Sequence, residues 1–258
     1  MKKILFVLFA AATATVFPRP ASAQQGYEFE VYGTDVKQPG VIELELNTNF
    51  VAAGPKLVDA EFVPTNHMLR SSLEVGAGLT RWLEASVYVL GARQSSGRSS
   101  YVGNRLRLTA VLPSTAGSPF GFGVTQEVGY ARPGFAEDRW TYELSPMVSA
   151  SWGSLDFVVN PAFERALDAT EPHSVEFEPR GKIARNFGDE GSIALEYYSS
   201  LGPVTAFEPR SEQNHQLFAS FEKELHERWE FALSYGHGLT DASDRSVIAT
   251  RVEYKFHR

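Results

Sequence analysis

The sequence predicts an all-β protein, a single antiparallel up-and-down transmembrane β-barrel of about twelve strands. Apolar and polar side chains alternate along about twelve stretches, each close to the ~9–11 residues that a tilted membrane strand needs. The connections between these stretches alternate between long and short, as in bacterial barrels whose short turns face the periplasm. After residue 23, no apolar run approaches the ~18 residues of a membrane helix.

The first 23 residues are a predicted signal peptide. Lys2 and Lys3 form a positive start, residues 4–16 form a short apolar run, and Ala21-Ser22-Ala23 matches an A-x-A cleavage site. The run is too short to span a bilayer, which argues against a membrane anchor. The chain has no cysteine, so its stability cannot come from disulfides.

Charge argues against a nucleic-acid partner. The formal net charge of the whole chain is −7, and the predicted signal peptide carries three of its basic residues, Lys2, Lys3 and Arg19. No basic patch stands out in the remainder. The remainder also has no linker or charge block that would mark a boundary between domains, so we expect a short leading segment and one barrel domain.

Residues 24–39 form the leading segment and residues 40–258 the predicted barrel. The segment contains the charged and aromatic string YEFEVYGTD, which runs from Tyr27 to Asp35. Our assignment is a short N-terminal periplasmic segment, and the alternative is a plug that reaches into the lumen. The sequence does not decide between the two.

The alternating stretches follow one another along residues 42–256. In the first, Ile42 and Leu44 alternate with Glu43 and Glu45, so one face of the strand is apolar and the other charged. The apolar faces of the stretches cover 42–50, 69–79, 83–89, 106–110, 120–128, 140–152, 157–163, 175–183, 193–197, 217–221, 229–235 and 248–256. Aromatic residues lie near the stretch ends, as in interfacial girdles; they are Trp82, Trp140, Trp152, Trp229 and Tyr254.

The connections support a membrane topology. Long ones are expected near 52–68, 91–100, 131–139, 165–174 and 202–214, and short ones at 80–81, 112–119, 153–154, 186–191 and 223–228. The last, 240–245, does not fit because it is not long. The alternative, a soluble sandwich or lipocalin-like barrel, would also alternate. However, it would usually include continuous apolar core strands, and its loops have no reason to alternate in length.

The predicted lumen face carries a dense charge network, which is the candidate site. One interpretation is cross-strand ion pairs that fill a narrow barrel, and the other is an acidic pore lining that favours cations. Barrels of eight strands are filled by side chains and those of sixteen hold a channel, so twelve lies between. The network comprises Glu43, Glu45, Glu74, Glu84, Arg105, Arg107, Glu127, Glu143, Glu176, Glu178, Arg180, Lys182, Glu196, Glu222, Glu230, Arg251 and Glu253.

The sequence predicts no catalytic site. His215, His237 and Ser246 share the lipid-facing phase, but no acidic residue of that phase is placed to orient an imidazole. There is no phosphate-binding loop and no metal-ligand spacing, so we expect neither cofactor nor metal. Lumen-side glycines are expected where the wall bends or another group packs closely; they are Gly76, Gly78, Gly121, Gly123 and Gly129.

Several strings resemble a family of bacterial outer-membrane transporters, the type named for the MetA pathway of phenol degradation. They are Pro39-Gly40, Glu43-Leu44-Glu45-Leu46-Asn47, Gly78-Leu79-Thr80-Arg81-Trp82-Leu83-Glu84, Glu127-Val128-Gly129-Tyr130, Glu137-Asp138-Arg139-Trp140, Glu196-Tyr197-Tyr198 and His215-Gln216-Leu217-Phe218. The resemblance implies an outer-membrane barrel with a transport role, and it carries over no catalytic or binding motif. One departure is that His257 and Arg258 follow Phe256, whereas such barrels often end on the aromatic residue.

Together these features predict a narrow channel or transporter for small solutes, embedded in the lipid of the cell outer membrane. We expect it not to be an enzyme. The alternatives are a structural or surface-interaction barrel with a plugged lumen and, more distantly, a lipid-modifying outer-membrane enzyme. The sequence predicts no oligomeric state.

Overall fold

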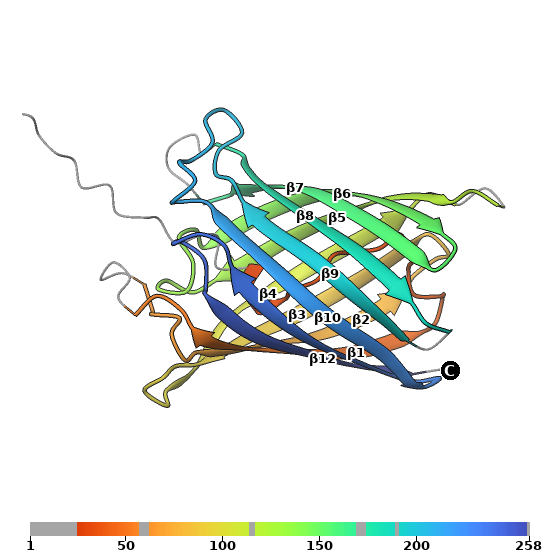
Figure 1. Ribbon diagram of the computed structural model, residues 1–258, viewed down its shortest axis with the longest axis horizontal. Helices are drawn as coiled ribbons and strands as arrows, with labels where there is room; N and C mark the ends of the chain where they lie inside the picture. Colours follow the sequence, from red (N-terminus) through yellow and green to blue (C-terminus); the bar gives the residue numbers. More distant parts are fainter. Residues whose placement is uncertain (1–24, 57–61, 114–116, 169–173, 189–190, 257–258) are drawn as a thin grey trace, which may run out of the picture.

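A computed structural model describes residues 25–56, 62–113, 117–168, 174–188 and 191–256, so the predicted signal peptide lies outside the described residues. Twelve antiparallel strands form a closed barrel in which each strand pairs with its neighbours in the chain and β1 closes onto β12 (Figure 1). The strands are β1 (Ile42–Ala53), β2 (Leu69–Gly78), β3 (Leu83–Arg93), β4 (Ser99–Val111), β5 (Phe120–Ala131), β6 (Trp140–Trp152), β7 (Leu155–Ala166), β8 (Glu176–Asn186), β9 (Gly191–Ser200), β10 (Asn214–His226), β11 (Trp229–Gly238) and β12 (Ser246–Phe256). The predicted fold class is confirmed. Within the described residues no helix is long and apolar enough to span a bilayer.

The two faces of the wall have opposite character. On β1, Ile42 and Leu46 are 44% and 43% exposed on the outside, whereas Glu43 and Glu45 are buried on the inside. The same pattern recurs around the barrel, where the exposed large side chains are overwhelmingly apolar. A soluble barrel would have the reverse arrangement. The outward apolar face is therefore a lipid-facing surface, and the closed wall leaves no unpaired sheet edge within it.

Aromatic side chains gather at both ends of this apolar face. Trp140 packs against Tyr130 with ring centroids 5.0 Å apart at the end where the longest connections lie. At the opposite end, Trp229 packs against Tyr254 at 4.7 Å. Pairs of this kind at strand ends are typical of the girdles that anchor a barrel at the membrane interfaces.

The connections alternate between the two ends of the barrel as predicted, but not every connection has the predicted length. One end of the barrel carries 54–68, 94–98, 132–139, 167–175, 201–213 and 239–245, and the other carries 79–82, 112–119, 153–154, 187–190 and 227–228. The prediction of a long connection at 91–100 is wrong, because β3 extends to Arg93 and β4 already begins at Ser99. They meet in a tight turn in which Gln94 N–H donates to the Arg98 carbonyl and Gly97 has a φ of +85°.

The described residues of the leading segment lie inside the barrel (Figure 1, in red and orange). At the long-loop end, Asn49 and Arg70 both donate to the Gly26 carbonyl, at 3.2 and 3.4 Å. At the short-turn end, Gly40 N–H donates to the Gly78 carbonyl at 3.2 Å. Residues 25–41, here called the luminal segment, thus run the length of the lumen. The described part of residues 24–39 therefore lies where the alternative of a plug would place it, against side chains and backbone groups of the lumen face.

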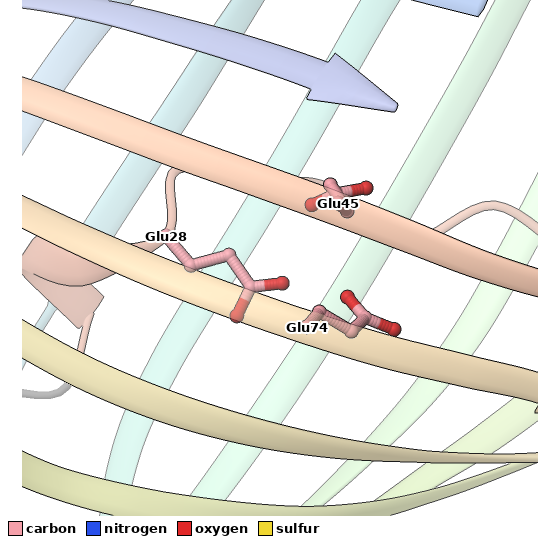
Figure 2. Close-up of side chains that lie close together, drawn as sticks. All are labelled: Glu28, Glu45 and Glu74. Carbon is pink, nitrogen blue, oxygen red and sulfur yellow. The ribbon is translucent and has the colours of Figure 1, made fainter. Parts of the chain in front are cut away.

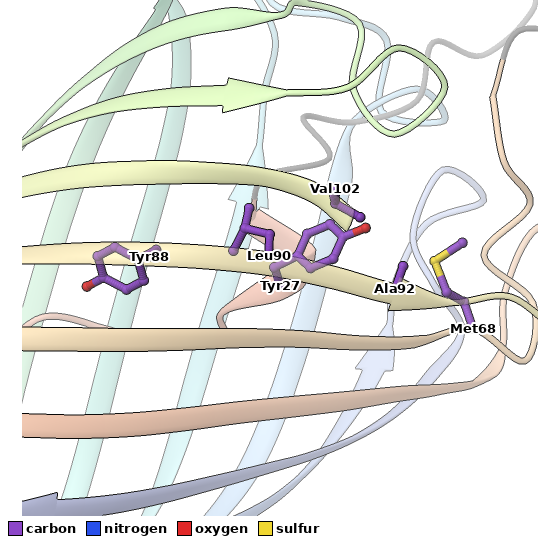
Figure 3. Close-up of a cluster of buried hydrophobic side chains, with 6 residues drawn as sticks. All are labelled: Tyr27, Met68, Tyr88, Leu90, Ala92 and Val102. Atoms are coloured by element: carbon purple, nitrogen blue, oxygen red, sulfur yellow. The ribbon is translucent and has the colours of Figure 1, made fainter. Parts of the chain in front are cut away.

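Two apolar clusters hold the outer half of the luminal segment. Tyr27, in the short helix η1 (Gln25–Tyr27), packs among buried residues near the long-loop end, namely Met68, Tyr88, Leu90, Ala92 and Val102 (Figure 3). Phe29 packs on Phe218 and Tyr198, with ring centroids 4.4 and 5.4 Å apart. These contacts give the segment one bound position inside a lumen that is otherwise mainly polar.

Replacing Leu195 with arginine should lower the free energy of unfolding in lipid by about 2–4 kcal/mol. Leu195 is 55% exposed in the middle of β9, so its side chain meets the hydrocarbon core of the bilayer. Leu239→Arg is the matched control, because this leucine lies at the end of β11 and the expected cost near an interface is about 0–1 kcal/mol. Denaturant unfolding in lipid vesicles measures both, and equal costs would contradict the assignment of the faces.

Candidate functional site

Carboxylates face one another across the lumen wall in two rows. One row crosses β11, β12, β1 and β2 and consists of Glu230, Glu253, Glu45 and Glu74. The other crosses β5 to β8 and consists of Glu127, Glu143, Glu164 and Glu176. Like charges directly opposite one another destabilise a sheet, so each row needs cations close by.

Two arginines on β4 lie in the lumen beside the second row. Arg105 Nε and Arg107 Nε each lie 3.3 Å from a different carboxylate oxygen of Glu127 on β5. The Arg107 guanidinium also lies 4.5 Å from the centre of the Tyr88 ring on β3. Both arginines are buried. We call Arg105 and Arg107 the arginine clamp.

Glu28 of the luminal segment fills the arginine clamp. Its two carboxylate oxygens lie 2.9 and 3.0 Å from Arg107 Nη2, and one of them lies 3.4 Å from Arg105 Nη1. Tyr32 covers the clamp from the same segment, with Arg107 donating to its hydroxyl and stacking 4.0 Å from its ring centre. The carboxylate of Glu28 is almost wholly buried, so these are charge-assisted bonds in a poorly solvated place.

The middle of the luminal segment is bound by polar side chains of the far wall. Tyr32 N–H donates to Asn160 Oδ1 at 2.8 Å, and the Asn160 amide donates back to the Tyr32 carbonyl at 2.9 Å. Thr34 Oγ1 lies 2.5 Å from Ser149 Oγ on β6, and Glu30 lies 3.1 Å from Arg251 on β12. The segment therefore contacts strands on opposite sides of the barrel.

Lys37 of the luminal segment lies among carboxylates of β1, β2 and β3, of which Glu74 belongs to the first row. Its ammonium lies 3.0 Å from Glu43, 3.6 Å from Glu84 and 3.8 Å from Glu74. Three carboxylates within 3.8 Å favour the charged form of this ammonium against the cost of its burial. Lys37 therefore stays charged. The luminal segment thus places a carboxylate against the arginines and an ammonium against the glutamates.

The remaining charges pair mostly within the wall. Arg180 contacts Glu143 and, at 3.8 Å, Glu178, and Lys182 contacts Glu222 at 2.6 Å and Glu196 at 3.9 Å. Further contacts are Arg251 to Glu230 at 2.7 Å, Lys255 to Glu253 at 3.0 Å, Asn47 to Glu45 at 2.5 Å and Ser174 to Glu176 at 3.3 Å. The structure thus places every residue of the candidate network on the lumen side.

Glu28, Glu45 and Glu74 come together in a triad (Figure 2) in which one carboxylate oxygen from each lies within 4.8 Å of the others. Three carboxylates at this spacing are a donor set for a metal ion. Here, however, the arginine clamp already engages Glu28, and Lys37 reaches Glu74. The protein's own cations therefore serve this triad.

A cavity of about 660 Å³ lies between the inner half of the luminal segment and the wall. Its lining includes Lys37, Arg251 and Lys255, but carboxylates such as Glu43 and Glu222 outnumber the cations. The cavity is therefore a polar, predominantly acidic chamber near the short-turn end of the barrel.

Glycines of the wall make room for the luminal segment. A Cβ atom at Gly78 would collide with the backbone carbonyls of Lys37 and Gln38, one at Gly76 would lie 2.6 Å from Lys37 Cε, and one at Gly121 would collide with Thr34. The sequence predicted either a bend of the wall or a closely packed group at these glycines, and it did not identify the group. Gly123 instead lies against Met147 of the neighbouring strand.

The three outward residues considered for catalysis are not assembled into a nucleophile and base. Among the described residues, the His215 ring contacts Tyr197 Oη at 2.5 Å and Gln213 Oε1 at 2.8 Å. Ser246 pairs across the strands with His237, but its hydroxyl donates to Tyr235 Oη at 3.3 Å.

No family model and no curated protein matches the sequence. Solved structures do match its fold. The COG4313 outer membrane channel from Pseudomonas putida F1 has a TM-score of 0.63 at 10% identity, covering 89% of this chain and 100% of that one. The KdgM porin has a TM-score of 0.57 at 12% identity, covering 83% of this chain and 99% of that one. The NanC porin has a TM-score of 0.55 at 7% identity, covering 84% of this chain and 99% of that one. The fold is that of outer-membrane channels. The narrower phenol-degradation family is not confirmed by these matches.

Proposed function

We propose that this protein is an outer-membrane channel for small polar solutes, which the luminal segment closes. One observation carries the proposal: the group that fills the lumen is not part of the wall. The wall is complete without it, because β1 pairs with β12 along nearly its whole length. The wall therefore does not need the segment in order to stay closed.

The manner of attachment supports a segment that can leave. Between Gly26 and Lys37, the hydrogen bonds that join the segment to the wall each use at least one side-chain atom, among the contacts of the described residues. Side-chain contacts with lumen groups can be exchanged for water one at a time. A strand of the wall, by contrast, could leave only by breaking a continuous backbone ladder.

The inner chamber supports the polar character of the solute. It is large enough for a small organic molecule, and charged and hydroxyl side chains line it. Membership in the phenol-degradation family is part of this proposal. It rests on the strings from Pro39-Gly40 to His215-Gln216-Leu217-Phe218, while the shared barrel fold supports only the broader class.

The rival function is a structural barrel with a permanent plug. The apolar contacts of Tyr27 and Phe29 favour it, because they make the outer half of the segment costly to displace. The two functions differ in the conductance they predict when a change in the wall loosens the segment. The channel should then conduct, whereas the barrel with a permanent plug should not.

Gly78→Ala should produce stable single-channel openings where the wild type is mostly closed. The new methyl group collides with the backbone of Gln38 and displaces the segment without changing any charge. Gly91→Ala is the control, because its Cβ would meet only the Ser100 carbonyl at 3.8 Å. A folded Gly78→Ala barrel that stays as silent as this control in planar bilayers would favour the permanent plug.

A further inference from the structure

The arginine clamp is contacted by a carboxylate of the wall and by a carboxylate of the luminal segment. Glu127 of the wall lies 3.3 Å from Arg105 Nε and from Arg107 Nε. Terminal nitrogens of both arginines contact the luminal segment. The second carboxylate comes from Glu28, on a segment that the proposed function requires to leave.

The clamp keeps its geometry by means that stay behind when Glu28 leaves. Glu127 accepts a hydrogen bond from Arg107 Nε and forms an ion pair with Arg105, and Tyr88 stacks on Arg107 from the wall. A buried pair of guanidinium groups that loses its contacts to Glu28 when the segment leaves is a site for an anion. Its ligand in the closed state is the flat, two-oxygen end of Glu28, with both oxygens on Arg107.

We propose that the arginine clamp is a binding site for the carboxylate group of a solute, and that Glu28 occupies this site as an internal substitute when the channel is closed. This inference rests on the proposed function for the departure of the segment. Tyr32 leaves with the segment and uncovers one face of the Arg107 guanidinium, so the site also offers a surface for a flat ligand to stack on.

The site can be tested in the full chain by chemical rescue. Glu28→Ala removes the internal carboxylate, and propionate has the size and charge of the missing side chain. We expect propionate to raise the apparent melting temperature of Glu28→Ala in detergent in a saturable manner, by roughly 3–6 °C at ten times its dissociation constant. Propionamide, which has the same shape without the charge, should not raise it.

Two further proteins make the result specific. The wild type should not respond to propionate, because Glu28 already fills the clamp. Glu28→Ala/Arg107→Gln should not respond either, because it lacks the guanidinium that holds both oxygens of the Glu28 carboxylate. If Glu28→Ala refolds poorly, the yield of refolded barrel with propionate or propionamide gives the same comparison.

The inference is overturned if propionate stabilises Glu28→Ala no more than propionamide does, or if it stabilises all three proteins equally. None of these measurements depends on conductance. A barrel that never conducts but shows rescue would refute the channel and keep the carboxylate site, and a conducting barrel without rescue would do the reverse.

Discussion

Deleting residues 25–38 is expected to convert a barrel that is closed in planar bilayers into one with long-lived openings. The deletion removes Glu28, Tyr32 and Lys37 from the lumen, while Pro39 and Gly40 remain to lead into β1. Without this segment, twelve strands enclose more space than their lumen side chains fill. This is the largest functional effect we expect of any change, because it removes the whole obstruction at once.

The deletion variant must be shown to fold before a lack of conductance is interpreted. The shift between heated and unheated samples on a denaturing gel reports whether the barrel has formed. As a matched control, replacing residues 25–38 with a Gly/Ser stretch of equal length keeps the chain length but removes the side chains that bind the wall. It should also open. A folded deletion variant without conductance would show that the wall alone closes the lumen.

Arg107→Ala should lower the free energy of unfolding by about 3–5 kcal/mol. Arg107 is only 4% exposed, and its loss leaves Glu28 and Glu127 with Arg105 as the single clamp cation. A buried carboxylate without its partner is costly, and the stacking on Tyr88 and Tyr32 is lost as well. Thermal or denaturant unfolding in lipid measures the difference.

Lys255→Ala is the control for the Arg107 prediction. The Lys255 side chain is 32% exposed beside Glu253, so its loss should cost about 0–1 kcal/mol. Adding Glu28→Gln to Arg107→Ala removes the carboxylate left without a partner, and part of the lost stability should return. Similar small losses for Arg107→Ala and Lys255→Ala would mean that the lumen is wide and well hydrated around the clamp.

The wall could be predicted from the sequence because lipid on one side and charge on the other impose a period of two on every strand. Strand ends were harder to place. The apolar face expected at 106–110 belongs to β4, which begins as early as Ser99. Its first residues include Ser100, Gly103 and Asn104, and backbone ladder bonds hold them in the sheet without any apolar alternation.

A plug was one of the two alternatives for residues 24–39, but its contacts could not be predicted, because its partners are scattered along the chain. Glu30 contacts Arg251, and Tyr32 contacts Asn160. The spacing of residues within 24–39 does not predict contacts so distant in the sequence. Two signals pointed toward it. Phe29 and Val31 alternate with Glu28 and Glu30 as in a wall strand, and the lumen-side glycines Gly76, Gly78 and Gly121 called for a close neighbour.

The most direct test of the account joins the segment covalently to the wall. The chain has no cysteine, and Thr34 Oγ1 lies 2.5 Å from Ser149 Oγ, so Thr34→Cys/Ser149→Cys creates a single disulfide between the segment and β6. Single-channel recording then compares one protein in two redox states. The account predicts that the reduced barrel shows the rare openings of the mostly closed wild type, that oxidation abolishes these openings, and that a reductant restores them. Equal conductance with the disulfide formed and broken would contradict it.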